Sequence, residues 1–296
     1  MTVTVAFLAR GLDGGLNAVT AFLASYASHP AGAAHRLVLA AKGWDDVPGR
    51  AELDPLAAAS GGSVLDLPDD GFDLGAYFRV AERAETEFVY LLNTHSRVLR
   101  DDWLALPLAL ASRAGVGAVG ATGSWGTLGA SWRLQMAICR TRLGDGRVMR
   151  ALARAVTAPP RCLIHWLRTR RDFPGFPNAH LRFNALLIRT ALLRRFAVAR
   201  GAPATKYQAW QLESGWDGLT RFISAQGLAS LVCGADGIGR EPDAWPDART
   251  LFTPGQPHLL VADNQTGLYA EGSARRRRDL ETWHWGHALT APDGTA

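Results

Sequence analysis

The chain has 296 residues, of which 48% are hydrophobic and 20% charged, a composition typical of a soluble globular protein with one large α/β domain or two small ones. No apolar run approaches the ~20 residues that a membrane-spanning helix needs, which argues against a transmembrane protein. The net charge is +5, its lysines being only Lys42 and Lys206, and this basic excess fits an anionic ligand or an anionic membrane surface.

The first half of the chain alternates between predicted strands and helices. The pattern predicts strands at 2–9, 35–41, 63–67 and 88–92, and helices at 16–28, 51–60 and 73–84. The last of these helices has a candidate N-cap at Asp70 or Asp73. Because the chain begins directly with a strand, we expect no signal peptide. The βαβα alternation predicts a parallel sheet with helices on both faces.

The stretch from Phe88 to Gly120 carries the strongest pattern. Its first five residues are continuously apolar, which is typical of a central strand covered on both faces. The polar run Asn93-Thr94-His95-Ser96 follows directly, at the strand end where open α/β sheets bind their ligands. Acidic residues at Asp101-Asp102-Trp103 predict the start of a helix, and a further strand begins at Val116.

The second half is less regular. Residues 124–131 predict a loop, and 132–171 a strongly basic helical segment that Pro159-Pro160 interrupt and 173–177 end. Further predicted elements are a strand at 183–188, helices at 190–197 and 212–227, and a strand at 228–233. After Gly234 the chain is rich in Pro, Gly and Trp, with one local strand at 259–263, so we expect an irregular C-terminal segment.

The segment FVYLLNTHSRVLRDDWLALPLALASRAGVGAVG (88–120) resembles glycosyltransferases of the GT-A fold, family 2 in particular. Their pattern is an apolar strand, Asp-x-Asp or Asn-x-Asp, a Trp-Leu helix and a Gly-rich strand. In those enzymes the Asp-x-Asp binds the divalent cation, Mg²⁺ or Mn²⁺, and the diphosphate of a sugar nucleotide. Here the matching triplet is Asn93-Thr94-His95.

This departure from the family pattern leaves the metal site open, because hard cations prefer oxygen ligands. In one reading His95 binds a metal through a ring nitrogen. In the other, Asn93 and His95 face the diphosphate and transfer is metal-independent.

Two segments of the first half are candidates for binding the donor. The Gly-rich turn after the first strand, Arg10 to Gly15, offers backbone amides and one guanidinium for a phosphate, although a plain turn would have the same sequence. The resemblance implies that Arg10 and Gly11 contact the nucleotide. It also places Asp73, in DDGFDLGAY (69–77), beside the base and ribose of the donor; its alternative role is a helix N-cap.

The segment PNAHLRFNALLIR (177–189) resembles the family strand that lies between donor and acceptor. His180, Arg182 and Asn184 alternate with apolar residues, and the two-residue period of a strand would put all three on one face. The resemblance implies that they, together with Arg189, contact the acceptor or the diphosphate. A solvated edge strand is the alternative.

The segment WQLESGWDGLTR (210–221) occupies the place of the family element that supplies the general base. By register Glu213 matches the catalytic carboxylate, and Ser214 replaces a second acid. Asp217 lies four residues on, and we expect it one helical turn away on the same face. Either carboxylate could accept the proton of the acceptor hydroxyl. An ordinary acidic helix start is the alternative.

The remaining candidates lie in the C-terminal and basic segments. GT-A enzymes often close over the donor with a C-terminal loop, for which the candidates are His258, Asp263, Asn264, His284 and His287. The run Arg275 to Arg278 predicts a solvated face or a mobile loop. Arginines interleaved with Trp and Leu in 132–171 could dock on an anionic membrane surface, or the segment could be a helical insertion that packs on the core.

The cysteines and the motif inventory restrict location and partners. Cys139, Cys162 and Cys233 lack metal-ligand spacing, which predicts free thiols in a reducing cytosol. With no helix-turn-helix, zinc finger or aromatic-basic RNA signature, the sequence does not favour nucleic acid as a partner.

The sequence therefore predicts an α/β, GT-A (Rossmann-like) fold with a mostly parallel central sheet flanked by helices. Residues 1–235 would form the domain, with 132–172 as a basic helical insertion and 236–296 as an extension or lid on the same domain. The resemblance implies inverting sugar transfer from a nucleotide-sugar donor to a glycan or lipid-linked acceptor, in bacterial cell-surface polysaccharide biosynthesis at the inner face of the membrane. The alternatives are a catalytically inactive nucleotide- or glycan-binding protein and a nucleotidyltransferase.

Overall fold

An eight-stranded sheet forms the centre of the computed structural model, which describes residues 3–129, 159–287 and 289. The strand order is β3-β2-β1-β4-β9-β6-β10-β11. The strands are β1 Val3–Arg10, β2 His35–Lys42, β3 Gly62–Leu67, β4 Phe88–Leu92, β6 Val116–Gly120, β9 Leu186–Arg189, β10 Ala229–Cys233 and β11 Gly239–Arg240. All neighbours pair in parallel except β9, which is antiparallel to β4 and β6, and β11, which is antiparallel to β10. The prediction of an α/β fold with a mostly parallel central sheet is confirmed.

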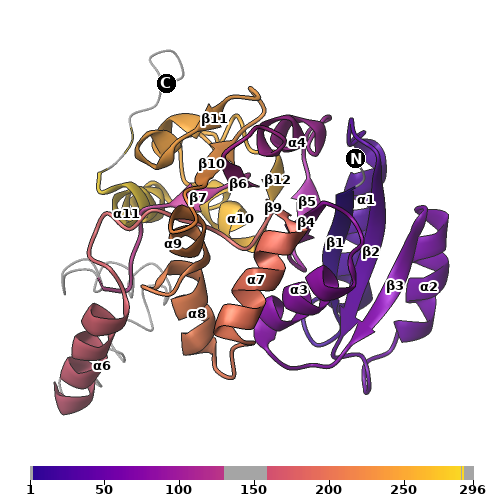
Figure 1. The fold of residues 1–296 in the computed structure, drawn as a ribbon, viewed down its shortest axis with the longest axis horizontal. Coiled ribbons are helices and arrows are strands. Elements are labelled where there is room, and N and C mark those ends of the chain that lie inside the picture. The colour runs from indigo at the N-terminus through magenta and orange to yellow at the C-terminus, as the bar shows by residue number, and fades with distance from the viewer. Residues whose placement is uncertain (1–2, 130–158, 288, 290–296) are drawn as a thin grey trace.

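Helices cover both faces of this sheet (Figure 1). One face carries α1 Gly15–Ser28, α2 Arg50–Ala59 and α4 Ala105–Ala111; the other carries α3 Phe72–Arg83, α7 Thr190–Arg200, α8 Lys206–Ser214 and α9 Leu219–Ser224. Side chains of β1 alternate between the two cores, so that Val5 and Phe7 pack on the α1 side while Ala6 and Leu8 pack on the α3 side. This two-sided burial explains the continuous apolar runs in the sequence.

The direction of β9 decides which residues reach the ligand-binding edge. Leu186, its first residue, pairs with Leu91 and Gly120 at the carboxyl ends of β4 and β6. The preceding segment, 180–185, therefore lies at that edge. Arg189, the last residue of β9, pairs with Phe88 at the opposite edge.

Two predicted helices begin differently in the structure. The helix predicted from Asp101 begins at Ala105, because Asp102 has a left-handed backbone (φ 57°) and its N–H donates to the carbonyl of Pro30. The helix N-cap before α3 is Gly71 (φ 65°), with no side-chain cap, so neither Asp70 nor Asp73 caps it. Gly71 takes this place because a left-handed backbone costs glycine no steric strain.

Two further elements, each predicted as continuous, are divided in the structure. The helix predicted at 212–227 is two helices, α8 and α9, because the backbone turns extended at Gly215 and Gly218 between them. The strand predicted at 183–188 is preceded by a separate two-residue strand, β8 His180–Leu181. Ala185, immediately before β9, has a left-handed backbone (φ 50°). The two-residue alternation of side chains predicted from His180 to Asn184 therefore does not continue into β9.

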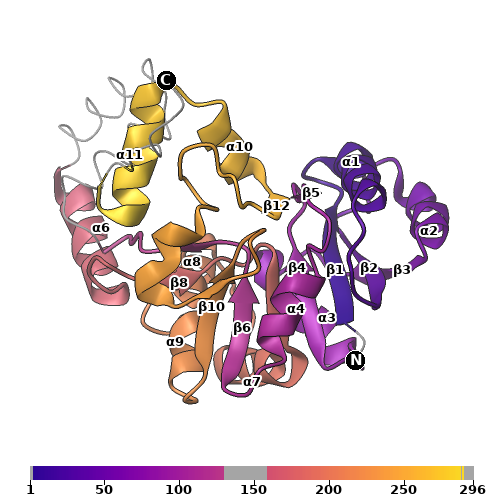
Figure 2. The same ribbon diagram turned by 90° about the horizontal axis from the view of Figure 1, so that it is seen from above.

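The C-terminal segment, expected to be irregular, contains a 3-10 helix and two α-helices. These are η1 Pro242–Ala248, α10 Asn264–Ala270 and α11 Ala274–Trp285. Asp263 caps α10 and Ser273 caps α11. The structure also has two small two-stranded sheets. In one, β12 Val261–Ala262 of the C-terminal segment pairs with β5 Arg97–Val98; in the other, β7 Gly123–Ser124 pairs with β8. Figure 2 shows α10 and α11 at the edge opposite to the N-terminal start of β1.

Part of the predicted basic segment, 132–158, lies outside the described residues. The rest forms α6 Pro159–Asp172, whose first two residues are the prolines predicted to interrupt the segment; proline is well suited to the first turn of a helix. Figure 1 shows α6 extending away from the sheet. Among the residues described, no helix combines the length and apolar character required to cross a membrane.

Candidate active site

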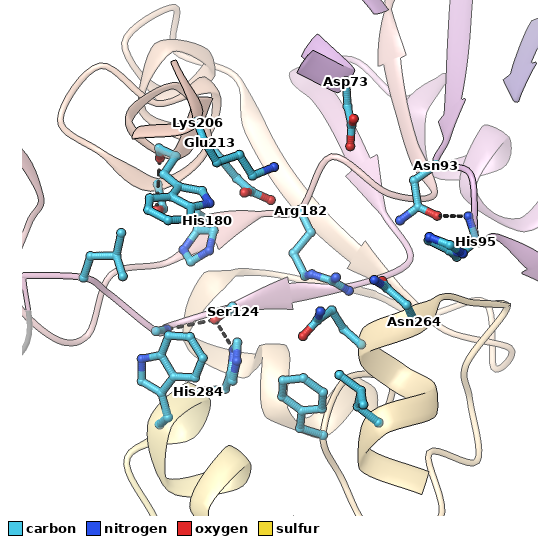
Figure 3. A pocket seen from close by; sticks show the side chains of 18 of the residues that line it. Asp73, Asn93, His95, Ser124, His180, Arg182, Lys206, Glu213, Asn264 and His284 are labelled. Atoms are coloured by element: carbon cyan, nitrogen blue, oxygen red, sulfur yellow. Dashed lines mark hydrogen bonds between the residues drawn. The ribbon is translucent and has the colours of Figure 1, made fainter. Parts of the chain in front are cut away.

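A cavity of about 570 Å³ opens at the carboxyl edge of the sheet, a size that suits a small-molecule site. Its walls come from the ends of β1 and β4, the start of α3, the segments 124–128 and 180–182, one face of α8, and helices α10 and α11. Figure 3 shows Asp73, Asn93 and His95 on one side, Ser124 and His284 on the other, with Arg182 and Asn264 between them.

Most of the predicted donor contacts line one end of this cavity. Arg10, Asp73, Asn93 and His95 all do so, because each follows or ends a strand whose carboxyl end lies at this edge. Gly11 does not. Its N–H donates to the carbonyl of Lys42 at 3.0 Å, and a Cβ at this position would lie 2.3 Å from the carbonyl oxygen of Gly43. Gly11 therefore allows the ends of β1 and β2 to pack closely.

Lys42, which the sequence analysis did not single out, fixes the start of α3. Its buried ammonium donates to the carbonyls of Asp70 and Phe72 at 2.9 and 2.8 Å and lies 3.4 Å from the Asp69 carboxylate. Burial lowers the pKa of Lys42, against the opposing effect of Asp69. These contacts hold the turn that presents Asp73 to the cavity. A single lysine ending an otherwise apolar strand was the available signal.

The loop after β4 is held by hydrogen bonds among its own residues and Asn184. The Asn93 side-chain oxygen accepts from the N–H of His95 at 3.0 Å and from the hydroxyl of Ser96 at 3.2 Å. Asn184, buried below it, accepts from the N–H of Asn93 at 3.1 Å and the hydroxyl of Ser96 at 2.8 Å. Asn93 stands where the glycosyltransferases that the sequence resembles have their first carboxylate. Its amide oxygen is used to fix the shape of this loop.

His95 contacts a carboxylate from a different strand end. Its Nε2 lies 3.2 Å from an oxygen of Asp13, and both residues line the cavity. Across the described ranges, no group of three or more His, Cys, Asp or Glu side chains is arranged to hold a metal ion. Within that part of the chain, His95 has one carboxylate partner rather than a set of protein ligands.

Asp263 links the segment before β9 to α10. Its fully buried carboxylate accepts from Arg182 at 2.7 Å and from the Asn184 amide at 3.2 Å. The other oxygen accepts from the N–H groups of Gln265 and Thr266 at 3.0 and 2.9 Å. Burial alone would raise the pKa of Asp263, but Arg182 and these N–H groups outweigh it and hold the pKa below its ordinary value.

One face of α8 supplies the central wall. Lys206, Trp210 and Glu213 line the cavity, spaced so that all three lie on one side of the helix. Ala209 and Leu212 on the other side are buried in the core. Thr205 and Gln208 form a capping box at the start of the helix. Neither Lys206 nor Trp210 was predicted, although this spacing and the Thr-x-x-Gln signature were present in the sequence.

Glu213 and His180 lie on this wall with defined orientations. A Glu213 carboxylate oxygen accepts from the N–H of Phe183 at 3.4 Å. The Nδ1 of His180 lies 2.8 Å from the carbonyl oxygen of Asn178; because a carbonyl only accepts, Nδ1 carries the proton and Nε2 the lone pair. Burial lowers the pKa of His180, against the opposing charge of Glu213, so the ring is neutral at pH 7.

The far end of the cavity is built from segments distant in sequence. The Ser124 hydroxyl lies 2.5 Å from Nδ1 of His284 and accepts from the N–H of Gly126 at 2.8 Å. Arg276, on α11, also lines this region, and its Nε is buried with no hydrogen-bond partner among the described residues. His284 was a sequence candidate, whereas Arg276 was assigned to a solvated face. The lid role predicted for 236–296 stays a prediction.

Several predicted site residues lie elsewhere. Asp217 is in the turn between α8 and α9, exposed, and forms an ion pair with Arg200 at 3.0 Å. The predicted shared helix face with Glu213 is therefore wrong, since the helix ends between them. Arg189 is at the opposite sheet edge. His258 and His287 are absent from the residues that line the cavity.

No protein-family model matches the chain, and neither does any curated protein. Among solved structures, galactosyltransferase LgtC in complex with donor and acceptor sugar analogues is 10% identical, with a TM-score of 0.45 over 99% of this chain and 98% of that one. Glucosyl-3-phosphoglycerate synthase from Mycobacterium tuberculosis, in complex with Mn²⁺, UDP-glucose and phosphoglyceric acid, is 16% identical, with a TM-score of 0.31 over 64% and 57% of the two chains. The 2-C-methyl-D-erythritol 4-phosphate cytidylyltransferase from Thermus thermophilus is 14% identical, with a TM-score of 0.39 over 84% and 97%.

Proposed function

We propose that the protein is a glycosyltransferase that moves a sugar from a nucleotide-sugar donor to a hydroxyl group of a glycan or lipid-linked acceptor. The observation that carries this proposal is the composition of the cavity. Arg10 and Asp73, a guanidinium and a carboxylate suited to a phosphate and a ribose, line one end of it, and the carboxylate of Glu213, on helix α8, lines its central wall. A donor whose nucleotide lies beside Arg10 and Asp73 would present its sugar to Glu213.

Glu213 is the general base in this proposal. The acceptor oxygen attacks the anomeric carbon, its proton passes to the Glu213 carboxylate, and the bond from that carbon to the diphosphate breaks with its electron pair left on the diphosphate oxygen. Attack opposite to the departing group inverts the anomeric configuration. The N–H of Phe183 orients the carboxylate. Asp217, the other sequence candidate, is exposed and paired with Arg200, so we assign the base to Glu213.

The proposed setting is synthesis of a bacterial cell-surface polysaccharide at the inner face of the membrane. The support is the exposed basic end of α6, where Arg168, Arg170 and Arg171 are all exposed. Arginines on a surface helix are attracted to anionic headgroups. Co-flotation with vesicles containing anionic lipid, compared with neutral vesicles, tests this setting; equal recovery from both would remove the support.

The transferase proposal is tested with one conservative variant and one matched control. Glu213→Gln keeps the shape of the side chain but cannot accept the proton, so we expect turnover to fall about 10²- to 10⁴-fold while nucleotide binding, read from the melting temperature, is kept. Asp217→Asn removes the same charge four residues away and should leave turnover unchanged. Loss of turnover in Asp217→Asn but not in Glu213→Gln would refute the assignment.

The same assays separate the two alternatives. A binding protein without catalysis would show a nucleotide-dependent melting shift but no transfer by the wild type across a panel of nucleotide sugars and acceptors. A nucleotidyltransferase would instead release pyrophosphate from a nucleoside triphosphate and a sugar phosphate. Either result would refute glycosyl transfer.

A further inference from the structure

Resting on the proposed function, we infer that the protein binds the diphosphate of its donor, and stabilises it as it leaves, with its own cationic side chains and without a divalent metal ion. Arg10 and Lys206 are the side chains assigned to this role, with Arg276 available from α11. All three line the cavity. The inference stands on two features of the cavity: the loop after β4 has an amide and an imidazole where a cation site needs carboxylates, and cationic side chains line the same cavity.

Two oxygen-bearing side chains near this end of the cavity, Asn93 and Asp13, contact other protein groups. The Asn93 amide oxygen accepts two hydrogen bonds from its own loop, at 3.0 and 3.2 Å. The Asp13 carboxylate contacts the ring of His95 at 3.2 Å. A magnesium ion at a nucleotide site is held by one or two carboxylates together with substrate phosphates and water. The loop after β4 offers the Asn93 amide and the His95 imidazole in place of such carboxylates, a donor set that does not fit a hard cation.

The cations of the cavity differ from one another in how far they are already neutralised. Arg182 is paired with a carboxylate, because it donates to the buried side chain of Asp263 at 2.7 Å. Arg10 has a long contact of 3.8 Å with Asp69, and its Nε is buried with no hydrogen-bond partner among the described residues. A buried donor without an acceptor is unfavourable, and a phosphate oxygen would supply the acceptor.

Lys206 and Arg276 are also free to bind an anion. Within the described ranges neither forms an ion pair, and Lys206 has only the ring of Phe72, 5.7 Å from its Nζ. The Nε of Arg276 is buried and without a hydrogen-bond partner in that same part of the chain. Lys206 stands on the same helix face as Glu213, so it lies on the wall along which the sugar would be transferred.

These cations supply what the reaction requires of a metal. When the bond between the sugar and the diphosphate breaks, the electron pair stays on a diphosphate oxygen and increases its negative charge. A guanidinium binds two phosphate oxygens at once and an ammonium acts as a point charge. Fixed cations placed where charge develops stabilise the departing group without prior rearrangement.

The first test is the melting temperature of the full-length protein with UDP, GDP, CDP, ADP or dTDP, each in EDTA and in Mn²⁺. Binding to the folded state raises the melting temperature. We expect one nucleotide to raise it in EDTA as much as in Mn²⁺. A rise only in Mn²⁺ would overturn metal-free binding while leaving the transferase proposal intact. No rise with any nucleotide in either condition would count against the transferase proposal as well.

The second test assigns the binding to named residues. In EDTA, Arg10→Gln and Lys206→Gln should each raise the Kd of that nucleotide about tenfold or more, since each removes a charged hydrogen bond to phosphate. Lys206 is exposed in the first turn of α8, so its replacement tests the inference even if Arg10→Gln fails to fold. Arg36→Gln, which removes an exposed arginine 3.9 Å from Glu85, is the control and should bind as the wild type. Wild-type affinity in both test variants would overturn the inference.

Discussion

Replacing Asp263 with alanine should destabilise the protein more than any exposed acidic substitution. The carboxylate is completely buried and makes four hydrogen bonds, to Arg182, to the Asn184 amide and to the first turn of α10. Removing it leaves the Arg182 guanidinium, itself only 14% exposed, without its counter-charge. It also leaves two backbone N–H groups of α10 without their acceptor.

The expected cost follows from these contacts. Breaking a buried ion pair by removing one partner costs about 3–5 kcal/mol, and loss of a helix N-cap costs about 1 kcal/mol. Because the contacts share one side chain they are not additive, so we expect about 4 kcal/mol in total, a large part of the roughly 5–15 kcal/mol of a typical domain. Asp263→Asn keeps an oxygen for the cap and should be milder by about 1 kcal/mol.

Urea unfolding of the wild type, Asp263→Ala and Asp263→Asn measures these differences in unfolding free energy directly. The control is Asp217→Ala, which breaks an exposed pair with Arg200 at 3.0 Å and should cost no more than about 1 kcal/mol. If Asp263→Ala costs no more than Asp217→Ala, Asp263 does not hold the two parts of the site together as argued.

The pH dependence has a defined sign. Because Arg182 and the α10 N–H groups hold the pKa of Asp263 below its ordinary value, the folded state favours the charged carboxylate. Its contribution is therefore fully present above an unfolded pKa of about 4 and is lost as pH falls through the lower folded value. The difference in unfolding free energy between wild type and Asp263→Asn should be constant near pH 7 and shrink below about pH 4.

Two further substitutions test packing and capping at the cavity. Gly11→Ala should cost about 1–3 kcal/mol in urea unfolding, because its Cβ would lie 2.3 Å from the carbonyl oxygen of Gly43, whereas Gly267→Ala, with no atom within 4 Å, should not destabilise; equal effects would refute the close approach. Thr205→Ala removes the capping box of α8 and should cost about 1 kcal/mol, and it should lower nucleotide affinity because α8 carries Lys206; an unchanged stability would show that the cap is not formed.

The donor end of the site could be predicted from sequence because it depends on local features. A parallel strand buried on both faces needs a continuous apolar run, and Phe88–Leu92 was predicted with the bounds it has in the structure. The carboxyl ends of parallel strands meet at one edge, so residues that follow those runs lie together. Arg10, Asn93 and His95 line the cavity for this reason.

The direction of β9 and the start of α4 depend on contacts between residues far apart in sequence, which no local pattern records. A strand as short as β9 does not reveal its own direction, and because it runs antiparallel, Arg189 and His180 lie at opposite edges of the sheet. Asp102 tolerates a left-handed backbone better than most residues, but the bond that holds it there is to Pro30, far away in sequence.

The helix predicted at 212–227 was missed for a different reason. The sequence features that decide where it breaks are local, but they favour opposite outcomes. Gly215 and Gly218 disfavour a continuous helix, whereas the acidic and apolar spacing favours one. The Thr205 capping box places the start of α8 earlier, and this earlier start is what brings Lys206 onto the face of Glu213. Weighing the cap and the two glycines above the periodicity would have found both the additional cation and the break.

The two ends of the cavity are consequently joined by a few long-range contacts. Arg182 pairs with Asp263 across 81 residues, and Ser124 contacts His284 across 160. The first contact lies beside the loop that carries His95, and the second positions the helix that carries Arg276. In the metal-free binding proposed above, the cations come from β1, α8 and α11. Donor binding would therefore depend on the long-range contacts that hold these elements around Glu213.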